Sequence, residues 1–138
     1  MSVTHGGRAK QFKWFFGGEH LVIENESGLK HTYSVEEILA VLSSIQTEFG
    51  EQWFPLANNV EKMYRGAEIR GLGTTIYHLR PGDTLHAQGA SYLGVVLDEV
   101  GILEWNGRSR GISWRLMVHP KVPRALRARL SRHASSPA

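Results

Sequence analysis

The chain of 138 residues contains no cysteine. This absence excludes a disulfide framework, a thiolate metal site and a cysteine nucleophile. The chain also has no apolar run near the roughly 20 residues that a membrane-spanning helix needs. Its first residues, MSVTHGGRAKQF, lack the apolar segment of a secretory signal. We therefore expect a cytoplasmic protein without a membrane partner.

Acidic residues are missing from the last quarter of the chain. Residues 105–138 contain 8 Lys or Arg and no Asp or Glu, whereas residues 1–104 contain 8 Lys or Arg and all 13 acidic residues. The two parts therefore carry net charges of +8 and −5. This asymmetry favours a polyanionic partner near residues 105–138. A solvated basic tail without a specific target is the alternative interpretation.

Patterns typical of catalytic or metal sites are also missing. The 7 histidines show neither an HExxH pattern nor another close zinc-binding spacing. No serine lies in a G-x-S-x-G nucleophile elbow. We therefore expect neither an enzyme nor a bound metal or cofactor.

The N-terminal part of the sequence is β-like. Residues 1–11 show no periodicity and are expected to form a flexible leader. From Phe12 onward, short apolar segments separated by Gly17-Gly18 and Ser27-Gly28 predict a meander of two or three strands. The aromatic cluster here favours a place in the core or a subunit interface over stacking on nucleic acid; it comprises Phe12, Trp14, Phe15 and Phe16.

A well-capped helix is predicted after the meander. Ser34 and Glu37 have the spacing of a capping box, in which Glu37 reaches back to the start of the helix. Gly50 provides the stop. One apolar stripe runs along the helix and predicts its buried face: Ile38, Val41, Leu42, Ile45 and Phe49.

Residues 51–83 are expected to contain two short helices. Pro55 bars a continuous helix, and Asn58 or Asn59 can cap a short one with Val60, Met63 and Tyr64 facing inward. A second short helix over residues 72–79 would bury Leu72, Ile76 and Leu79, and residues 80–83 must form a turn. The RGLG segment at 70–73 lacks the lysine of a phosphate-binding loop, so we do not favour an anion site there.

The prediction of the fold depends mainly on the segment from Asp83 to Met117. Apolar residues at spacings of three and four predict a helix over 84–100, capped by Asp83 or Thr84 and ended by Gly101. Gly89 and Gly94 inside it indicate either a close helix crossing or a start near Ala90. A period of two then predicts a hairpin whose turn begins at Asn106-Gly107.

The predicted order of elements resembles the winged helix-turn-helix superfamily: a helix, a tight turn, a second helix and a hairpin with a basic tip. The resemblance covers residues 72–118 and extends to 34–50 if the capped helix is the first of the domain. It implies an α+β fold: a winged helix-turn-helix-like domain with an N-terminal β-meander and a basic C-terminal extension. The expected boundaries are a leader at 1–11, one domain at 12–118 and a tail at 119–138.

The resemblance implies a transcriptional regulator that binds double-stranded DNA as a homodimer, with half-sites about one duplex turn apart. Helix 84–100 would read the major groove with His86, Gln88, Ser91 and Tyr92. Arg108 and Arg110 at the wing tip would contact the minor groove or the backbone. A protein-interaction or dimerisation module without DNA binding is the alternative, with the aromatic N-terminal region as its surface.

The segment RALRARLSR predicts a short helix in the tail, with Leu126 and Leu130 four residues apart. It is expected to be a phosphate-binding extension that is ordered only on binding, or a docking helix across a dimer. In the first case Arg124, Arg127 and Arg129 would contact DNA.

Overall fold

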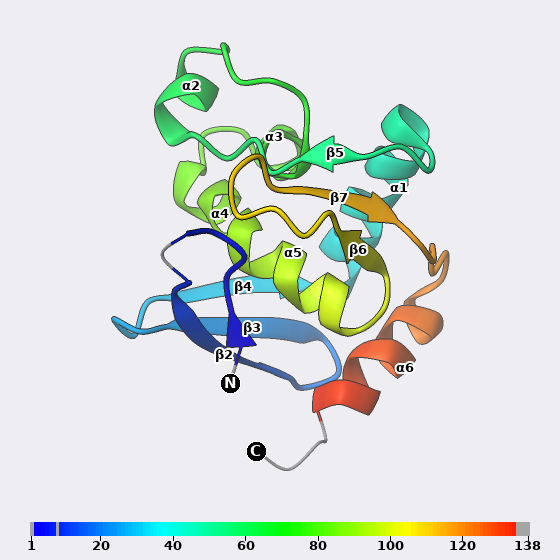
Figure 1. Ribbon diagram of the computed structural model, residues 1–138. Helices are drawn as coiled ribbons and strands as arrows, with labels where there is room; N and C mark the ends of the chain where they lie inside the picture. Colours follow the sequence, from blue (N-terminus) through cyan, green and yellow to red (C-terminus); the bar gives the residue numbers. More distant parts are fainter. Residues whose placement is uncertain (1, 8, 135–138) are drawn as a thin grey trace.

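A computed structural model describes residues 2–7 and 9–134 and shows a mixed α+β fold (Figure 1). The N-terminal strands form an antiparallel sheet in the order β1-β2-β3-β4. Their bounds are Ser2–Val3, Gln11–Phe16, His20–Asn25 and Lys30–Ser34. Gly18 and Gly28 have φ values of 102° and 87° in the two connecting turns. The predicted meander is confirmed.

The first residues differ from the predicted flexible leader. Ser2 and Val3 pair with Phe12 and Gln11, so a short strand extends the sheet beyond the expected meander. The hydroxyl of Ser2 also donates to the carboxylate of Glu99, far along the chain. A partner so distant in sequence leaves no local pattern, which is why the leader looked unstructured.

The capped helix is confirmed as α1, Val35–Phe49. The Ser34 hydroxyl accepts a hydrogen bond from the Glu37 amide at 3.0 Å, and Gly50 follows the last turn with φ 60°. The capping box predicted that the carboxylate of Glu37 reaches back to the start of the helix. Instead, this carboxylate contacts His86 and Arg80. The buried stripe matches the prediction at Ile38, Val41, Leu42 and Ile45.

Two short helices lie between α1 and the turn at 80–83. Strand β5, Phe54–Pro55, precedes α2, Val60–Tyr64, in which Asn59 caps the amide of Lys62. Helix α3 spans Leu72–Leu79, as predicted. Tyr64 and Leu79 were expected to be buried but are 79% and 45% exposed, because each lies at the end of its helix.

The predicted helix 84–100 is two helices. Helix α4, Thr84–Gln88, ends at Gly89, and α5, Ala90–Glu99, starts from that residue. A Cβ on Gly89 would lie 2.2 Å from the Tyr33 hydroxyl, and one on Gly94 would lie 2.3 Å from the Trp114 ring. Both glycines therefore permit close approach of a strand residue, Tyr33 of β4 and Trp114 of β7, and not the helix crossing that was one of the two interpretations. The other interpretation, a start near Ala90, is confirmed for α5.

The predicted hairpin is formed by β6, Leu103–Trp105, and β7, Ser113–Leu116. It belongs to a second antiparallel sheet with strand order β5-β7-β6. Helix α6, Pro123–Ala134, follows and packs against α1 and β2. Figure 1 shows α5 lying between the N-terminal sheet and this second sheet.

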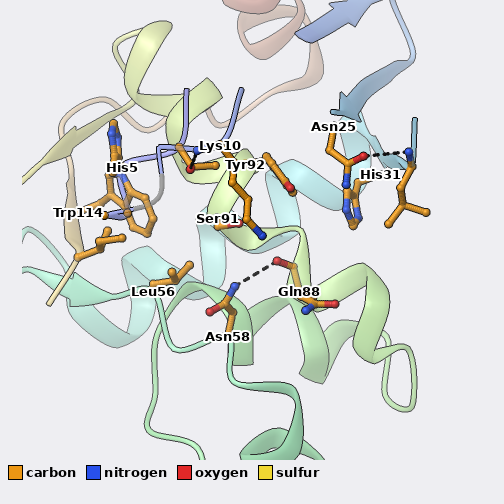
Figure 2. Close-up of a pocket in the computed structure, with 15 residues that line it drawn as sticks. His5, Lys10, Asn25, His31, Leu56, Asn58, Gln88, Ser91, Tyr92 and Trp114 are labelled. Carbon is orange, nitrogen blue, oxygen red and sulfur yellow. Dashed lines mark hydrogen bonds between the residues drawn. The ribbon is translucent and has the colours of Figure 1, made fainter. Parts of the chain in front are cut away.

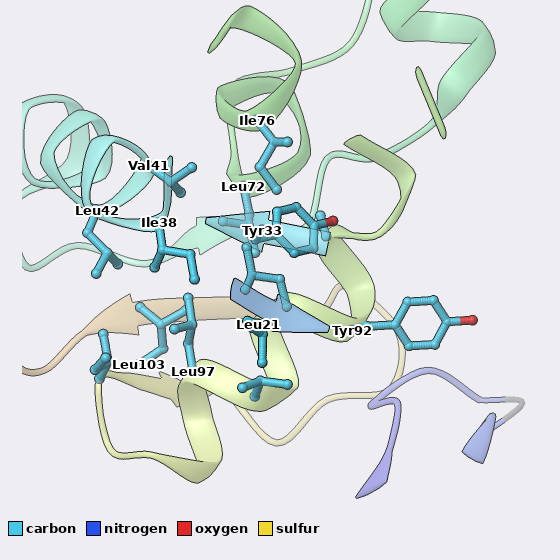
Figure 3. Packing of buried hydrophobic residues seen from close by; sticks show 14 of the residues in the cluster. Leu21, Tyr33, Ile38, Val41, Leu42, Leu72, Ile76, Tyr92, Leu97 and Leu103 are labelled. Carbon is cyan, nitrogen blue, oxygen red and sulfur yellow. The ribbon is translucent and has the colours of Figure 1, made fainter. Parts of the chain in front are cut away.

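One hydrophobic core joins these layers. Side chains from β3, α1, α3 and α5 meet in it (Figure 3), and Leu21, Ile38, Leu72 and Leu97 are at most 1% exposed. Trp114 from β7 and Leu126 from α6 belong to the same cluster. Among the helices of the described residues, none has the length and apolar character to cross a membrane.

Candidate nucleic-acid interface

Helix α5, the central part of the predicted reading helix, is enclosed by the rest of the chain. Residues Tyr92 through Leu97 are all buried. The N-terminal sheet covers the face that was expected to be open, and Phe12 meets the Tyr92 ring edge-on at a centroid distance of 5.1 Å. The prediction that Tyr92 is presented to solvent is wrong, since its side chain is only 8% exposed.

His86 is also buried, contrary to the prediction. Its Nε2 atom contacts the carboxylate of Glu37, and its ring lies 4.5 Å from the Tyr33 ring. The Tyr33 hydroxyl donates to the His86 carbonyl oxygen at 2.8 Å, and Arg80 lies 3.6 Å from the second Glu37 oxygen. These contacts link β4, α1 and α4, so His86 holds elements together and is not available to read a groove.

The protonation of neighbouring groups follows from burial. Burial raises the pKa of the Tyr33 hydroxyl well above its usual range, and the nearby Glu37 carboxylate adds to this effect. Burial lowers the pKa of His31, and His86 lowers it further. Both groups are therefore favoured in their neutral forms, as expected for side chains that support packing.

Gln88 and Ser91 differ from His86 and Tyr92 in their accessibility. Gln88 is exposed and Ser91 is half-buried, and both lie at the junction of α4 and α5. Together with Tyr92 they line a cavity of about 420 Å³ (Figure 2). Two further lining residues, Lys10 and Asn58, were not expected in a site, because Lys10 lies in a loop without periodicity and Asn58 was considered only as a helix cap.

The hairpin tip is held in a defined shape by its own side chains. Asn106 Oδ1 accepts from the Arg108 amide at 3.1 Å, and Asn106 Nδ2 donates to the Gly111 carbonyl oxygen at 3.0 Å. The indole of Trp105 donates to the Arg108 carbonyl oxygen at 3.1 Å. Arg108 and Arg110 are both exposed, and neither guanidinium has an ion-pair or hydrogen-bond partner among the described residues.

The predicted tail arginines fall into two groups. Arg127 donates to the Gly18 carbonyl oxygen at 2.9 Å and to Glu19 at 3.0 Å. Arg129 donates to the Val100 carbonyl oxygen at 3.0 Å. Both side chains therefore fasten α6 to the body, whereas Arg124 is exposed. The prediction that this helix orders only on binding is wrong, because Leu126 and Leu130 are fully buried.

Within residues 2–7 and 9–134, no cluster of three or more His, Asp or Glu side chains is arranged to hold a metal ion. Comparisons with protein-family models, with curated proteins and with solved structures find no significant match to the chain.

Proposed function

We propose that residues 35–116 form a winged-helix unit whose wing binds double-stranded DNA. The element order supports the first part: α1 is followed by β5, the helices α2 to α5, and the hairpin of β6 and β7. The sheet order β5-β7-β6 sets the hairpin beside the strand that follows α1. This strand order, with the hairpin following the last helix, supports the proposal of a winged-helix unit, to which an N-terminal sheet on α5 is added.

The accessible cations at the hairpin tip carry the proposal of DNA binding. Arg108 and Arg110 project from a loop that Asn106 holds in place, and no described carboxylate neutralises them. Phosphate groups are the natural partners of such guanidinium groups, which can donate two parallel hydrogen bonds. Because the loop is already ordered, binding costs less conformational entropy than it would for a flexible tip.

The covered helix changes the expected mode of binding. A helix that reads bases must enter the major groove with several side chains free. Here His86 and Tyr92 are buried, and α5 contacts both β1 and β6. We therefore propose backbone contacts by the wing, with little dependence on base sequence, and no longer propose groove reading by α5.

The experiment compares two double variants that remove the same charge. Arg108→Ala/Arg110→Ala removes the wing cations, and Lys121→Ala/Arg124→Ala removes two exposed cations near the start of α6. Affinity for a random-sequence duplex is measured by fluorescence anisotropy over a range of salt concentrations. If each wing arginine contacts one phosphate, the slope of log affinity against log salt falls by about 2 in the wing variant.

The control variant separates wing contact from general charge attraction. We expect it to retain most of the affinity and the slope of the original chain. Equal losses in both variants would assign binding to overall charge, in which case the wing has no special role. No binding by the original chain at low salt would refute the DNA proposal.

A protein-interaction surface is the second candidate, and the exposure of Phe15 favours it. Phe15 is 48% exposed on β2, opposite Val22 of β3, while Trp14 and Phe16 pack against the core. A homodimer through this face is measured by analytical ultracentrifugation, and Phe15→Ser is expected to weaken it. The homodimer and the cytoplasmic location stay predictions from the sequence.

A further inference from the structure

The cavity at the start of α5 lies where segments far apart in the sequence meet. The loop before β2, the turn between β3 and β4, the segment after β5, the α4–α5 junction and the base of the hairpin all contribute to its wall. Its volume of about 420 Å³ falls within the roughly 300–1,000 Å³ typical of small-molecule sites. A cavity of this size between several elements can hold a ligand smaller than a macromolecule.

Several donors in this cavity have no hydrogen-bond partner among the described residues. Tyr92 is only 8% exposed, but its hydroxyl is not among the buried unpartnered atoms of the described residues and has no hydrogen-bond partner there, so it is open to the cavity. Figure 3 shows this hydroxyl pointing away from the aliphatic core. The Ser91 hydroxyl and the Lys10 ammonium group also have no described partner, and Figure 2 shows these side chains beside one another on the cavity wall.

The backbone adds further donors at the same place. Helix α5 has ten residues, and its N-cap, Gly89, has no side chain to accept hydrogen bonds from the first turn. The first amides of a helix are unsatisfied by the helix itself and favour negative charge. In α5 the Tyr92 amide already donates to the Gly89 carbonyl oxygen at 3.0 Å, which leaves the amides of Ala90 and Ser91 without a described backbone partner. Asn58 Nδ2 donates to the Gln88 carbonyl oxygen at 3.1 Å, and among the described residues no first-turn amide of α5 donates to Asn58 Oδ1.

The charge of the wall favours an anion. None of the described residues that line the cavity is Asp or Glu, and Lys10 supplies a positive charge. The pKa of His31, which also lines it, is lowered by burial and by His86, so this ring contributes no stable positive charge. Two carboxylates lie close to the wall: Asp98 pairs with the lining residue His5 at 3.4 Å, and Glu26 lines an adjoining hollow. One Glu26 oxygen already accepts from the Gln11 amide at 2.6 Å.

We propose that this cavity binds a small organic phosphate monoester. A phosphate monoester offers three terminal oxygens as acceptors, which suits the Ser91 and Tyr92 hydroxyls, the Lys10 ammonium group and the first amides of α5. A carboxylate has only two oxygens and satisfies fewer of these donors. Leu56, Ile112 and Trp114 provide apolar lining for the organic part.

The test uses phenyl phosphate as the probe and the full chain without DNA. Binding is followed through the amide signals of residues 90–92 in ¹H–¹⁵N NMR spectra. We expect saturable shifts with phenyl phosphate, weaker binding of benzoate and no shifts at these amides with phenol. No saturable shift with phenyl phosphate in the millimolar range would overturn the proposal.

Matched variants test the named donors. Lys10→Met and Lys13→Met remove the same charge from nearby positions, but Lys13 pairs with Glu24 outside the cavity. We expect the Kd for phenyl phosphate to rise at least tenfold in Lys10→Met and to change less than twofold in Lys13→Met. Tyr92→Phe, which keeps the ring contact with Phe12, is expected to raise it several-fold.

Equal effects of the two lysine variants would assign binding to net charge and overturn the site. A further measurement adds a DNA duplex to the complex with phenyl phosphate and compares the amide shifts before and after the addition. Retention of the shifts at residues 90–92 supports a separate small-molecule site, while their displacement by duplex would mean that DNA phosphates occupy it. Because the titration itself needs no DNA, its outcome is independent of whether the wing binds DNA.

Discussion

The wing tip and helix α5 were both expected to face DNA, but the folded chain treats them differently. The tip of the β6–β7 hairpin, which we propose as the wing, is exposed and ordered by Asn106, with Arg108 and Arg110 free of described partners. Helix α5 is covered by the N-terminal sheet, and its predicted reader Tyr92 packs against Phe12. A helix can match a sequence pattern for recognition and still be enclosed by a segment that precedes it by many residues.

The two groups of C-terminal arginines show the same difference. Arg127 and Arg129 are used as internal donors to the Gly18 and Val100 carbonyl oxygens. The wing arginines have no such described role. Net charge in a sequence therefore overestimates the charge available to a partner, because part of it satisfies backbone groups inside the molecule.

The largest expected effect on stability comes from substituting a glycine of α5, compared with a glycine at the hairpin tip. Gly94→Ala places a Cβ 2.3 Å from the Trp114 ring, whereas Gly107 at the wing tip has no atom within 4 Å of such a Cβ. We expect Gly94→Ala to lower the free energy of unfolding by about 3 kcal/mol through overpacking. Gly107→Ala should cost about 1 kcal/mol, because its φ of 80° is unfavourable for a side chain. Urea denaturation measures both.

If the two variants had equal stability, α5 would not be held as tightly against β7 as described. The contrast between a tightly packed helix α5 and an open hairpin tip would then be wrong.

A smaller effect is expected at the buried link between α1 and α4. Glu37→Gln removes the charge that pairs with His86 and Arg80, and hydrogen bonds to charged groups contribute roughly 1.5–3 kcal/mol. We expect a loss of about 2 kcal/mol in the free energy of unfolding. Glu36→Gln removes the same charge from the same helix turn at an exposed position and should cost less than about 0.5 kcal/mol. Thermal denaturation of both variants in parallel separates the contribution of the Glu37–His86 pair from that of the helix dipole. Equal losses of stability in the two variants would contradict a structural role for His86.

The smallest effect concerns the arginines of α6. Arg127→Ala removes the donor to Gly18 and Glu19, and we expect a loss of about 1 kcal/mol, typical of a partly exposed hydrogen bond. Arg124→Ala, at an exposed position of the same helix, should change stability by less than about 0.5 kcal/mol. Chemical denaturation provides the measurement. A larger loss for Arg124→Ala would reverse our assignment of which arginine fastens the helix.

Local patterns predicted most of the elements. The Ser34 cap and the Gly50 stop gave α1, and the spacing of Leu72 and Ile76 gave α3, because each signal lies within a few residues of the feature that it specifies. The candidate site was predicted less well. Gln88 and Ser91 remain accessible, but His86 and Tyr92 are buried by β4 and β2, and Lys10 joins the cavity from a loop that showed no periodicity.

The sequence by itself determined most of the elements of this protein, several of their caps and turns, and the concentration of positive charge after residue 104, since these depend on neighbouring residues or on composition. Only the tertiary structure decided which faces are open. The N-terminal sheet encloses α5, α6 uses two arginines internally, and distant loops create the cavity around Ser91. The physical reason is that burial and hydrogen-bond partners depend on long-range packing, which no short segment encodes alone.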